Sequence, residues 1–325
     1  MRTELLTMLR ETNNYLSGQK ICDTFGVSRT AVWKAINQLR KNGYEIEAVP
    51  NKGYRLLEVP DILNLHELQS RRKTKWIGQE TLCYETIDST NAEAKRLAEG
   101  SYGHGTLIVA DHQQAGRGRR GRSWESPAGT SIYMSLLLKP EINPNNASML
   151  TLVAALAVAR AITQITGKQA GIKWPNDIVM NGKKVCGILT EMSAQFDYVN
   201  HIVVGIGINA NTENFPEEIE HMATSLWLET GIRVNRAELI EAVWEYFEEV
   251  YEIYMETQDL RNLVKEYNAS LVNMHQNVKV LDPKEPFEGR AMGITPRGEL
   301  MVDTWESRKL VSSGEVSVRG IYGYV

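Results

Sequence analysis

The segment Gln113–Trp124, QQAGRGRRGRSW, carries the residue types best suited to binding an anionic ligand. Glycines alternate there with four arginines, Arg117, Arg119, Arg120 and Arg122. Glycine lets a backbone approach a ligand closely, and guanidinium groups offer paired donors to phosphate or carboxylate oxygens. Flexible RNA-binding tails and solvated basic loops have the same composition. Here strand-like apolar runs flank the segment at Gly105–Ala110 and Thr130–Leu138, which favours a loop that is fixed at both ends and binds an anion.

Two further motifs place polar groups where strands and helices should begin or end. In Asp88–Asn91 (DSTN), small hydrogen-bonding residues begin an expected helix, where they could bind a polar ring or simply cap the helix. In Lys173–Asp177 (KWPND), Pro175 fixes a turn between two strands and places Asp177 at a strand edge. That carboxylate could organise Mg²⁺ with a triphosphate or accept backbone N–H groups of the turn, while Trp174 should be a core residue.

These motifs together resemble those of the biotin protein ligases. Asp111–Trp124 is similar to the family's adenylate-binding loop. DSTN, KWPND, Lys183–Glu191 (KKVCGILTE) and Gly205–Asn209 (GIGIN) match its other signatures in the same order. Residues 1–60 resemble the winged-helix domain of the bifunctional repressor-ligase subclass, so the resemblance extends over essentially the whole chain.

The resemblance implies a two-step ligase reaction. The carboxylate of biotin attacks the α-phosphate of ATP, bound with Mg²⁺, to give biotinyl-5′-AMP and pyrophosphate. A lysine of a biotin carboxyl carrier protein or carboxylase domain then takes the biotinyl group. The chain has no GxSxG, GxxxxGK[ST] or HExxH motif and no metal-ligand cluster among its six histidines. Neither step needs an enzyme nucleophile, because positioned cations can stabilise charge on the phosphate oxygens.

The resemblance also implies roles for individual residues. Lys184, Arg119 and Asp177 are the expected catalytic residues, with Asp177 also the candidate Mg²⁺ ligand. The expected biotin-binding residues are Ser89, Thr90, Asn91, Gln113, Arg117, Gly118, Arg119, Lys184, Gly187 and Gly205. The expected ATP or adenylate contacts are Arg117, Arg119, Arg120, Arg122, Lys173, Asn176, Asp177 and Asn209. The sequence departs from the family's pattern at Ser131, where a glycine is usual, and at Cys186, which we expect to narrow the biotin pocket slightly.

The first 60 residues predict a winged helix-turn-helix. Ser17 can cap a helix over Gly18–Phe25, Gly26 suits the turn that follows, and Ser28 can cap a helix over Arg29–Lys41. Strands at Tyr44–Val49 and Tyr54–Leu57 would form the wing around Pro50–Gly53. A small interaction domain with a solvated charged face would have a similar pattern. The expected DNA contacts are Arg29, Thr30, Trp33, Lys34, Asn37, Lys52 and Arg55.

The rest of the chain predicts an α+β protein with two more domains. After a linker (61–75), residues 76–275 should form a central α/β mixed-sheet ligase domain, and residues 276–325 a small SH3-like β-barrel. The expected central strands are Leu82–Ile87, Thr106–Ala110, Ile132–Leu138, Gly171–Trp174, Asp177–Met180, Lys184–Ser193 and Asn200–Ile208. Helices are expected at Asn91–Ala98, Met149–Thr166 and Arg236–Met255, the last with an acidic face that we expect to be solvated.

Composition indicates a cytoplasmic protein. Three cysteines without CxxC spacing point to a reducing compartment, and the most apolar segment, Met149–Ile162, is too short to span a bilayer. The net charge of −4 conceals a mildly basic N-terminal module, with nine Lys and Arg against six Asp and Glu in residues 1–60. One winged helix reads one half-site, so we expect a homodimer on operator DNA with biotinyl-5′-AMP as corepressor.

Two alternatives stay open at this point. The chain could be a DNA-binding regulator whose ligase-like body only senses biotin, although a sensor need not retain GRGRRG, KWPND and Lys184. It could also be a lipoate or octanoate ligase, although the arginine-rich loop and the winged helix favour biotin.

Overall fold

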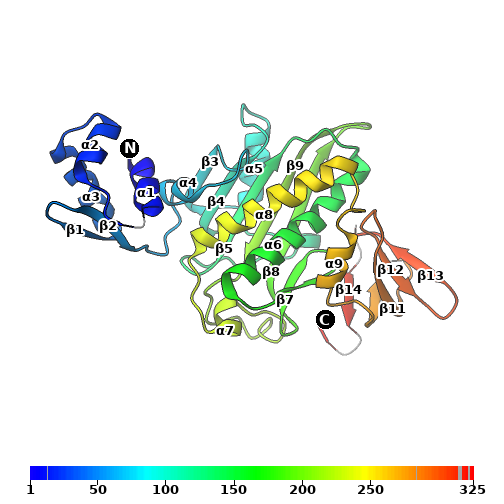
Figure 1. Cartoon of the computed structure of the whole chain (residues 1–325). Coiled ribbons are helices and arrows are strands. Elements are labelled where there is room, and N and C mark those ends of the chain that lie inside the picture. The colour runs from blue at the N-terminus through cyan, green and yellow to red at the C-terminus, as the bar shows by residue number, and fades with distance from the viewer. Residues whose placement is uncertain (13, 283, 314–316, 321–322) are drawn as a thin grey trace.

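The computed structural model describes residues 1–12, 14–282, 284–313, 317–320 and 323–325. The N-terminal and C-terminal domains lie at opposite ends of the central domain (Figure 1). The N-terminal domain has its own apolar core, whereas the apolar residues of the C-terminal strands join the core of the central domain. The winged domain is therefore attached through polar contacts, and the C-terminal domain through shared apolar packing.

The N-terminal domain is the predicted winged helix-turn-helix. It comprises α1 (Arg2–Glu11), α2 (Gly18–Phe25), α3 (Arg29–Lys41), β1 (Glu45–Val49) and β2 (Gly53–Glu58). The caps also form as predicted. Ser17 accepts from the backbone N–H of Lys20, Ser28 accepts from that of Ala31, and Gly26 takes a left-handed conformation with φ 63° between the two helices. Local chemistry thus fixes the turn that sets α3 against α2.

The buried carboxylate of Glu67 joins this domain to the segment that follows. Helix α4 (Leu65–Arg71) lies within the predicted linker and begins after Asn64, whose side chain caps it. Glu67 on α4 is fully buried and accepts from Arg10 (2.5 Å), Tyr44 (2.6 Å) and Arg71 (2.6 Å). The linker is therefore packed between the domains rather than free in solvent.

The central domain is built on a seven-stranded sheet in the order β3-β4-β5-β9-β8-β7-β6. Only the β3–β4 pair is parallel, so the sheet is mixed as predicted. Its strands are β3 (Thr81–Ile87), β4 (Thr106–Gln113), β5 (Ile132–Leu138), β6 (Gly171–Lys173), β7 (Asp177–Met180), β8 (Lys183–Ala194) and β9 (Val199–Ile208). Each strand matches its predicted position to within a few residues, since alternating apolar runs are a local signal.

Helices cover both faces of this sheet. Helices α6 (Leu150–Thr166) and α8 (Arg236–Thr257) pack on one face within the main core (Figure 1). Helix α5 (Thr90–Ala98) covers the other face, where Ala94 contacts a smaller cluster that includes Ile108 and Val203. The second face is only partly covered by α5, which leaves room on it for a ligand.

The apolar helix is longer than the sequence suggested. The 3-10 turn η2 (Pro144–Met149) runs directly into α6, and the combined segment Pro144–Thr166 has the length and apolar composition to cross a membrane. The expectation that this segment is too short was therefore wrong. However, 72% of its most apolar window is buried within the protein, as in the core helix of a globular domain.

The expectation that the acidic face of α8 is solvated was correct for Glu238, Glu249 and Glu252, which are exposed, but not for Glu248, which is buried. Glu248 accepts hydrogen bonds from the backbone N–H groups of Lys75 (2.7 Å), Trp76 (2.9 Å) and Ile77 (3.2 Å). Lys73 pairs with Glu241 at 2.8 Å, and Lys75 pairs with an exposed glutamate further along the helix. The basic linker and the acidic helix are complementary, so this face holds the linker.

The C-terminal domain is an antiparallel sheet in the order β13-β12-β11-β10-β14. Its strands are β10 (Asn277–Leu281), β11 (Phe287–Ile294), β12 (Leu300–Asp303), β13 (Arg308–Val311) and β14 (Ser317–Gly320). The predicted C-terminal β-domain therefore consists of five short strands within the described residues. The sequence did not predict α7 (Leu226–Thr230), η1 (Arg119–Gly121) or α9 (Val264–Ser270).

Candidate active site and DNA-binding face

A polar cluster forms at the N-terminus of α5. Ser89 caps the helix, accepting from the backbone N–H of Ala92, as in the ordinary interpretation of the DSTN motif. Gln113, at the end of β4, accepts from the backbone N–H of Thr90 (2.8 Å) and from its hydroxyl (3.1 Å). Three predicted biotin-binding residues and Gln113 therefore meet in one place, although Gln113 lies 23 positions from Thr90 in sequence.

Two residues that the sequence did not single out complete this cluster. Ser135 of β5 is fully buried and donates to the Asn91 side-chain oxygen at 2.6 Å. Glu191 of β8 accepts from the Asn91 amide at 2.8 Å and from Lys95 at 2.8 Å. Ser135 lies in none of the motifs, and Glu191 ends the KKVCGILTE motif without a predicted role. The pairing of β5, β8 and β9 brings both residues to Asn91.

Glycines in β8 and β9 leave space over the sheet for these polar side chains. A Cβ atom at Gly205 would lie 2.0 Å from the Asn91 side-chain oxygen, and one at Gly207 would lie 2.6 Å from Trp124 Nε1. A Cβ at Gly187 would lie 2.9 Å from the Trp124 ring. Gly187 and Gly205 therefore leave space for Trp124 and Asn91, and their predicted contact with biotin stays a prediction.

Trp124 therefore lies over the floor of the polar pocket. Its indole Nε1 is buried and has no hydrogen-bond partner among the described residues. A cavity of about 50 Å³ remains beside it, lined by Asn91, Arg117 and Lys184 together with other residues of the motifs. An unpartnered buried donor in a polar cavity suits a ligand with a hydrogen-bond acceptor.

A cluster of charged side chains lies at the end of β7. Lys184 Nζ pairs with Asp177 Oδ1 at 2.6 Å, and the hydroxyl of Tyr324 donates to the other Asp177 oxygen. Burial would raise the pKa of Asp177, but Lys184 and the hydrogen bonds to the carboxylate lower it overall. The carboxylate is therefore ionised and fixes Lys184 near the Trp124 ring, 5.1 Å from its centroid.

Lys173 belongs to the same cluster. Its Nζ lies 3.6 Å from the centroid of the Tyr324 ring, and the side chain is buried. Burial lowers the pKa of Lys173 to about 8 despite the nearby Asp177. Tyr324 was not predicted as a site residue, because it lies 147 positions from Asp177 along the chain.

The arginines of the loop are divided between two cavities. Arg117 lines the small cavity, whereas Arg120 and Arg122 line a larger one of about 1060 Å³. Arg119 lines both and donates to the Asn176 side chain at 2.8 Å and to the backbone oxygen of Ser313 at 2.6 Å. Burial lowers the pKa of Arg119, which is half-buried, whereas Arg117, Arg120 and Arg122 are exposed.

The larger cavity is wide enough for a nucleotide. Predicted residues Asn209, Asn176 and Asp177 line it, and so do Phe215 and Arg319, which were not predicted. Asn209 is held in place by its side-chain bond to the backbone oxygen of Thr224 (3.0 Å). Since Arg319 lies on β14, the C-terminal domain contributes a cation to the cavity.

Both departures from the family pattern have structural explanations. Cys186 is fully buried in the main core and does not line the small cavity, so the expectation that it narrows the biotin pocket was wrong. Its neighbour Gly187 faces the cavity because side chains alternate along a strand. Ser131 is buried, and its hydroxyl is 2.8 Å from that of Thr212.

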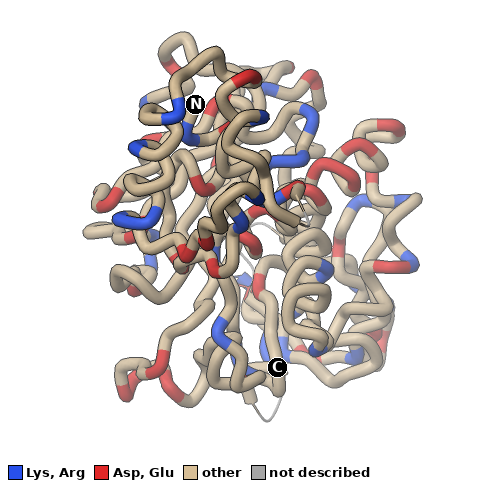
Figure 2. Tube along the Cα trace, turned by 60° about the vertical axis from the view of Figure 1, so that its left-hand side comes forward, with Lys and Arg blue, Asp and Glu red and all other residues tan. Residues whose placement is uncertain are grey.

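The predicted DNA-contacting residues lie on α3 and the wing. Arg29, Thr30, Trp33, Lys34 and Lys52 are exposed, Asn37 is half-buried, and Trp33 retains 57% of its surface. Arg55 is half-buried, lies 5.1 Å from the Tyr15 ring centroid and pairs with Glu47 at 3.1 Å, so it is partly engaged within the wing. Acidic and basic segments are interspersed over the molecule as a whole (Figure 2).

Comparison with known proteins identifies the family. Residues 83–209 match the biotin/lipoate A/B protein ligase family, residues 2–55 an HTH domain, and residues 276–319 the biotin protein ligase C-terminal domain. The bifunctional ligase/repressor BirA of Bacillus subtilis is 41% identical over 321 residues, which cover 98% of both chains. This chain belongs to the biotin protein ligase family of bifunctional ligase/repressors.

More distant members of the biotin protein ligase family agree with this assignment. BirA of Escherichia coli is 29% identical over 97% of this chain and 96% of its own. A solved biotin protein ligase of Aquifex aeolicus, in complex with biotin and ATP, superposes with a TM-score of 0.66 at 33% identity. The superposition covers 74% of this chain and 99% of the Aquifex chain.

Proposed function

We propose that this chain is a biotin–protein ligase that is also a biotin-responsive transcriptional repressor. As a ligase it converts biotin and ATP to biotinyl-5′-AMP and transfers the biotinyl group to a lysine of a biotin carboxyl carrier protein or carboxylase domain. As a repressor it binds operator DNA of biotin biosynthesis or transport genes through its winged helix.

The observation that carries the proposal is the junction of two cavities of different chemistry. The small cavity is lined by neutral polar groups of Ser89, Thr90 and Asn91, suited to a ureido ring. The large one is lined by cations and suits a nucleotide. Both include Lys184 and Arg119, so these side chains lie where a carboxylate from one cavity would meet a phosphate from the other.

The proposed chemistry follows from this junction. A carboxylate oxygen of biotin forms a bond to the α-phosphorus of ATP as the bond to the bridging oxygen breaks, and pyrophosphate leaves with that electron pair. Negative charge grows on the phosphate oxygens, where Lys184 and Arg119 can stabilise it. In the second step the acceptor amine attacks the acyl carbon, AMP departs, and the amine loses a proton. Trp124 and the loop over it would shield the anhydride from water.

Mg²⁺ enters this scheme as part of the substrate MgATP. Within the described part of the chain, no group of three or more His, Cys, Asp or Glu side chains could hold a metal ion. Asp177 alone is available, and both of its oxygens already accept hydrogen bonds. One available carboxylate fits a Mg²⁺ ion that arrives bound to the triphosphate and takes at most one ligand from the protein. This is the usual mode for nucleotide-bound Mg²⁺.

The regulatory part of the proposal rests on α3, the wing and the relatives. Arg29, Thr30 and Lys34 are exposed on α3, as an element that enters the major groove requires. One such domain contacts one half-site, so the active repressor would be a homodimer that forms when biotinyl-5′-AMP is bound. The three free cysteines agree with a role in the cytoplasm, without a membrane partner.

Pyrophosphate exchange into ATP tests the ligase reaction. We expect exchange that depends on biotin and not on lipoate. Lys184→Ala and Arg119→Ala should reduce it severely while leaving the winged domain folded. Lys183→Ala is the matched control, because Lys183 is the adjacent lysine but bonds the backbone oxygen of Glu220 on the surface. Exchange with lipoate alone would indicate a lipoate ligase, and tight biotin binding without exchange would indicate a sensor.

A further inference from the structure

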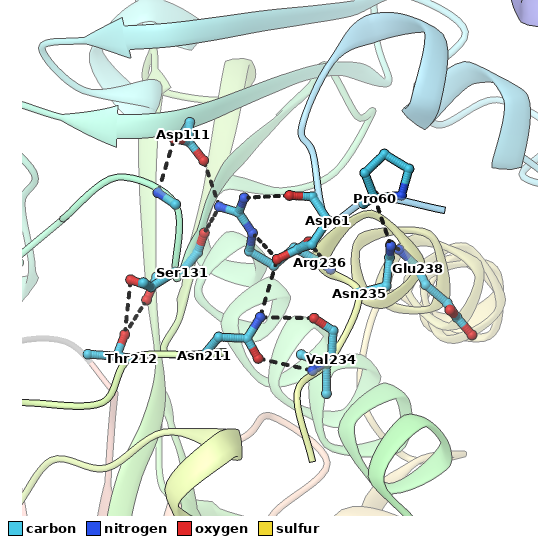
Figure 3. A network of polar contacts seen from close by, with 12 residues as sticks. Pro60, Asp61, Asp111, Ser131, Asn211, Thr212, Val234, Asn235, Arg236 and Glu238 are labelled. Atoms are coloured by element: carbon cyan, nitrogen blue, oxygen red, sulfur yellow. Dashed lines mark hydrogen bonds and ion pairs between the residues drawn. The ribbon is translucent and has the colours of Figure 1, made fainter. Parts of the chain in front are cut away.

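A buried arginine joins the interdomain linker to both ends of the arginine-rich loop. Arg236 is the first residue of α8 and is only 2% exposed. A cation is disfavoured at a helix N-terminus by the helix dipole, and a buried one requires charged partners. Two carboxylates supply that compensation, Asp61 from the linker and Asp111 from β4 (Figure 3).

The first branch of this network leads to the DNA-binding domain. Arg236 Nε donates to Asp61 Oδ2 at 3.0 Å, and the backbone N–H of Arg236 donates to Asp61 Oδ1 at 2.9 Å. Asn235 adds a weaker bond to the backbone oxygen of Pro60 at 3.4 Å. Pro60 and Asp61 directly follow the wing strand β2, so this branch fixes the point at which the winged domain leaves the ligase body.

The second branch leads to the loop. Arg236 Nη1 donates to Asp111 Oδ1 at 2.6 Å and to the backbone oxygen of Ser131 at 3.1 Å. The other Asp111 oxygen accepts from the backbone N–H of Gly129 at 3.0 Å. Asp111 and Ser131 lie at the two ends of the segment that contains Gln113–Trp124. A single guanidinium nitrogen therefore holds both stems of the loop together (Figure 3).

A third branch reaches the nucleotide cavity. Asn211 donates from its side chain to Asp61 Oδ2 at 3.3 Å and from its backbone to the oxygen of Thr130 at 2.7 Å. Its neighbour Thr212 lines the larger cavity and contacts the Ser131 hydroxyl. The linker, the loop stems and the cavity wall thus share one set of hydrogen bonds.

We propose that Arg236 is a positioning residue that couples the arginine-rich loop to the attachment of the DNA-binding domain. Movement of the linker at Asp61 changes the hydrogen bonds of Arg236. Because Arg236 also bonds Asp111 and Ser131, the positions of the two loop stems change with it. Coupling between two binding sites is reciprocal, so a ligand that orders the loop also stabilises the linker. This goes beyond the proposed function, because it assigns a physical connection between the ligase site and the DNA-binding domain.

Asp61→Asn in the full chain is the test variant, read by hydrogen–deuterium exchange. Asp61 is a third exposed and belongs to neither domain's core, so the variant should fold. We expect amides of residues 112–131 to exchange about ten-fold faster than in the native protein, which corresponds to about 1.4 kcal/mol. In the native protein, biotin with MgATP should slow exchange at residues 61–63 as well as at 112–131. In Asp61→Asn, the ligands should still slow exchange at 112–131 but no longer at 61–63.

Glu67→Gln is the matched control. Glu67 also ties the winged domain to the linker, through Arg10 and Tyr44, yet it contacts neither stem of the loop. This variant should loosen the winged domain and leave exchange at 112–131 unchanged. Unchanged loop exchange in Asp61→Asn, or an equal rise in Glu67→Gln, would overturn the proposal. If biotin and MgATP fail to protect residues 88–91, that result would count against the proposed function. It would leave the proposed coupling untouched, because the comparison of Asp61→Asn with the native protein is made without ligands.

Discussion

Gly205→Ala offers the sharpest test of the pocket geometry. An added Cβ would lie 2.0 Å from Asn91 Oδ1 and 2.7 Å from Asn91 Cγ, so the Asn91 side chain must move. That movement breaks its bonds to Ser135 and Glu191, at 2.6 and 2.8 Å. Overpacking of a tight site costs about 1–3 kcal/mol, which corresponds to roughly 5- to 150-fold in a dissociation constant.

Calorimetric titration with biotin, combined with thermal unfolding, measures this effect. We expect biotin affinity to fall by about two orders of magnitude at most and by about five-fold at least. Gly103→Ala is the matched control, because a Cβ there would meet nothing within 4 Å. Native-like biotin affinity in Gly205→Ala would refute the reasoning.

A second variant shows whether Asn91 is the reason for the glycine. Asn91→Ser shortens the side chain and removes the clash with a Cβ at position 205. In the Asn91→Ser background, Gly205→Ala should therefore cost much less than it does in the native protein, a non-additivity typical of residues in contact. Additive losses would mean that Gly205 is needed for another reason.

Three further predictions concern charged groups. The pKa of Lys173 is about 8, so the side chain loses its charge above that pH, and kcat/KM for ATP should fall as pH rises through 8. Lys173→Arg should abolish this pH dependence, because arginine keeps its charge. Tyr324→Phe removes the hydroxyl that bonds Asp177 and should change the KM for ATP several-fold while the KM for biotin stays the same; steady-state exchange kinetics measure both. Glu248→Gln weakens three backbone hydrogen bonds to the linker and should lower the free energy of unfolding by about 2 kcal/mol without abolishing exchange, as denaturant titration would record.

Local sequence signals were enough to predict the helix-turn-helix and the strands of the central sheet. Ser17, Gly26 and Ser28 fixed the helix-turn-helix because caps and left-handed turns depend on a few neighbouring residues. Gly187 and Gly205 indicated space above the sheet for the same reason, because the absence of a side chain is read directly from the residue type.

Which distant residues bond to one another depended on packing across the whole fold. Tyr324, which bonds Asp177, and the partners of Glu248 and Arg236 come from segments more than a hundred positions away. Charge alone does not select among the many acidic and basic residues of the chain. The burial of Glu248 on the acidic face of α8 was not predicted, because an amphipathic pattern reveals that a face is polar but not whether another segment covers it. Burial, which turns a surface charge into a structural partner, is a property of packing and therefore lies outside any local pattern.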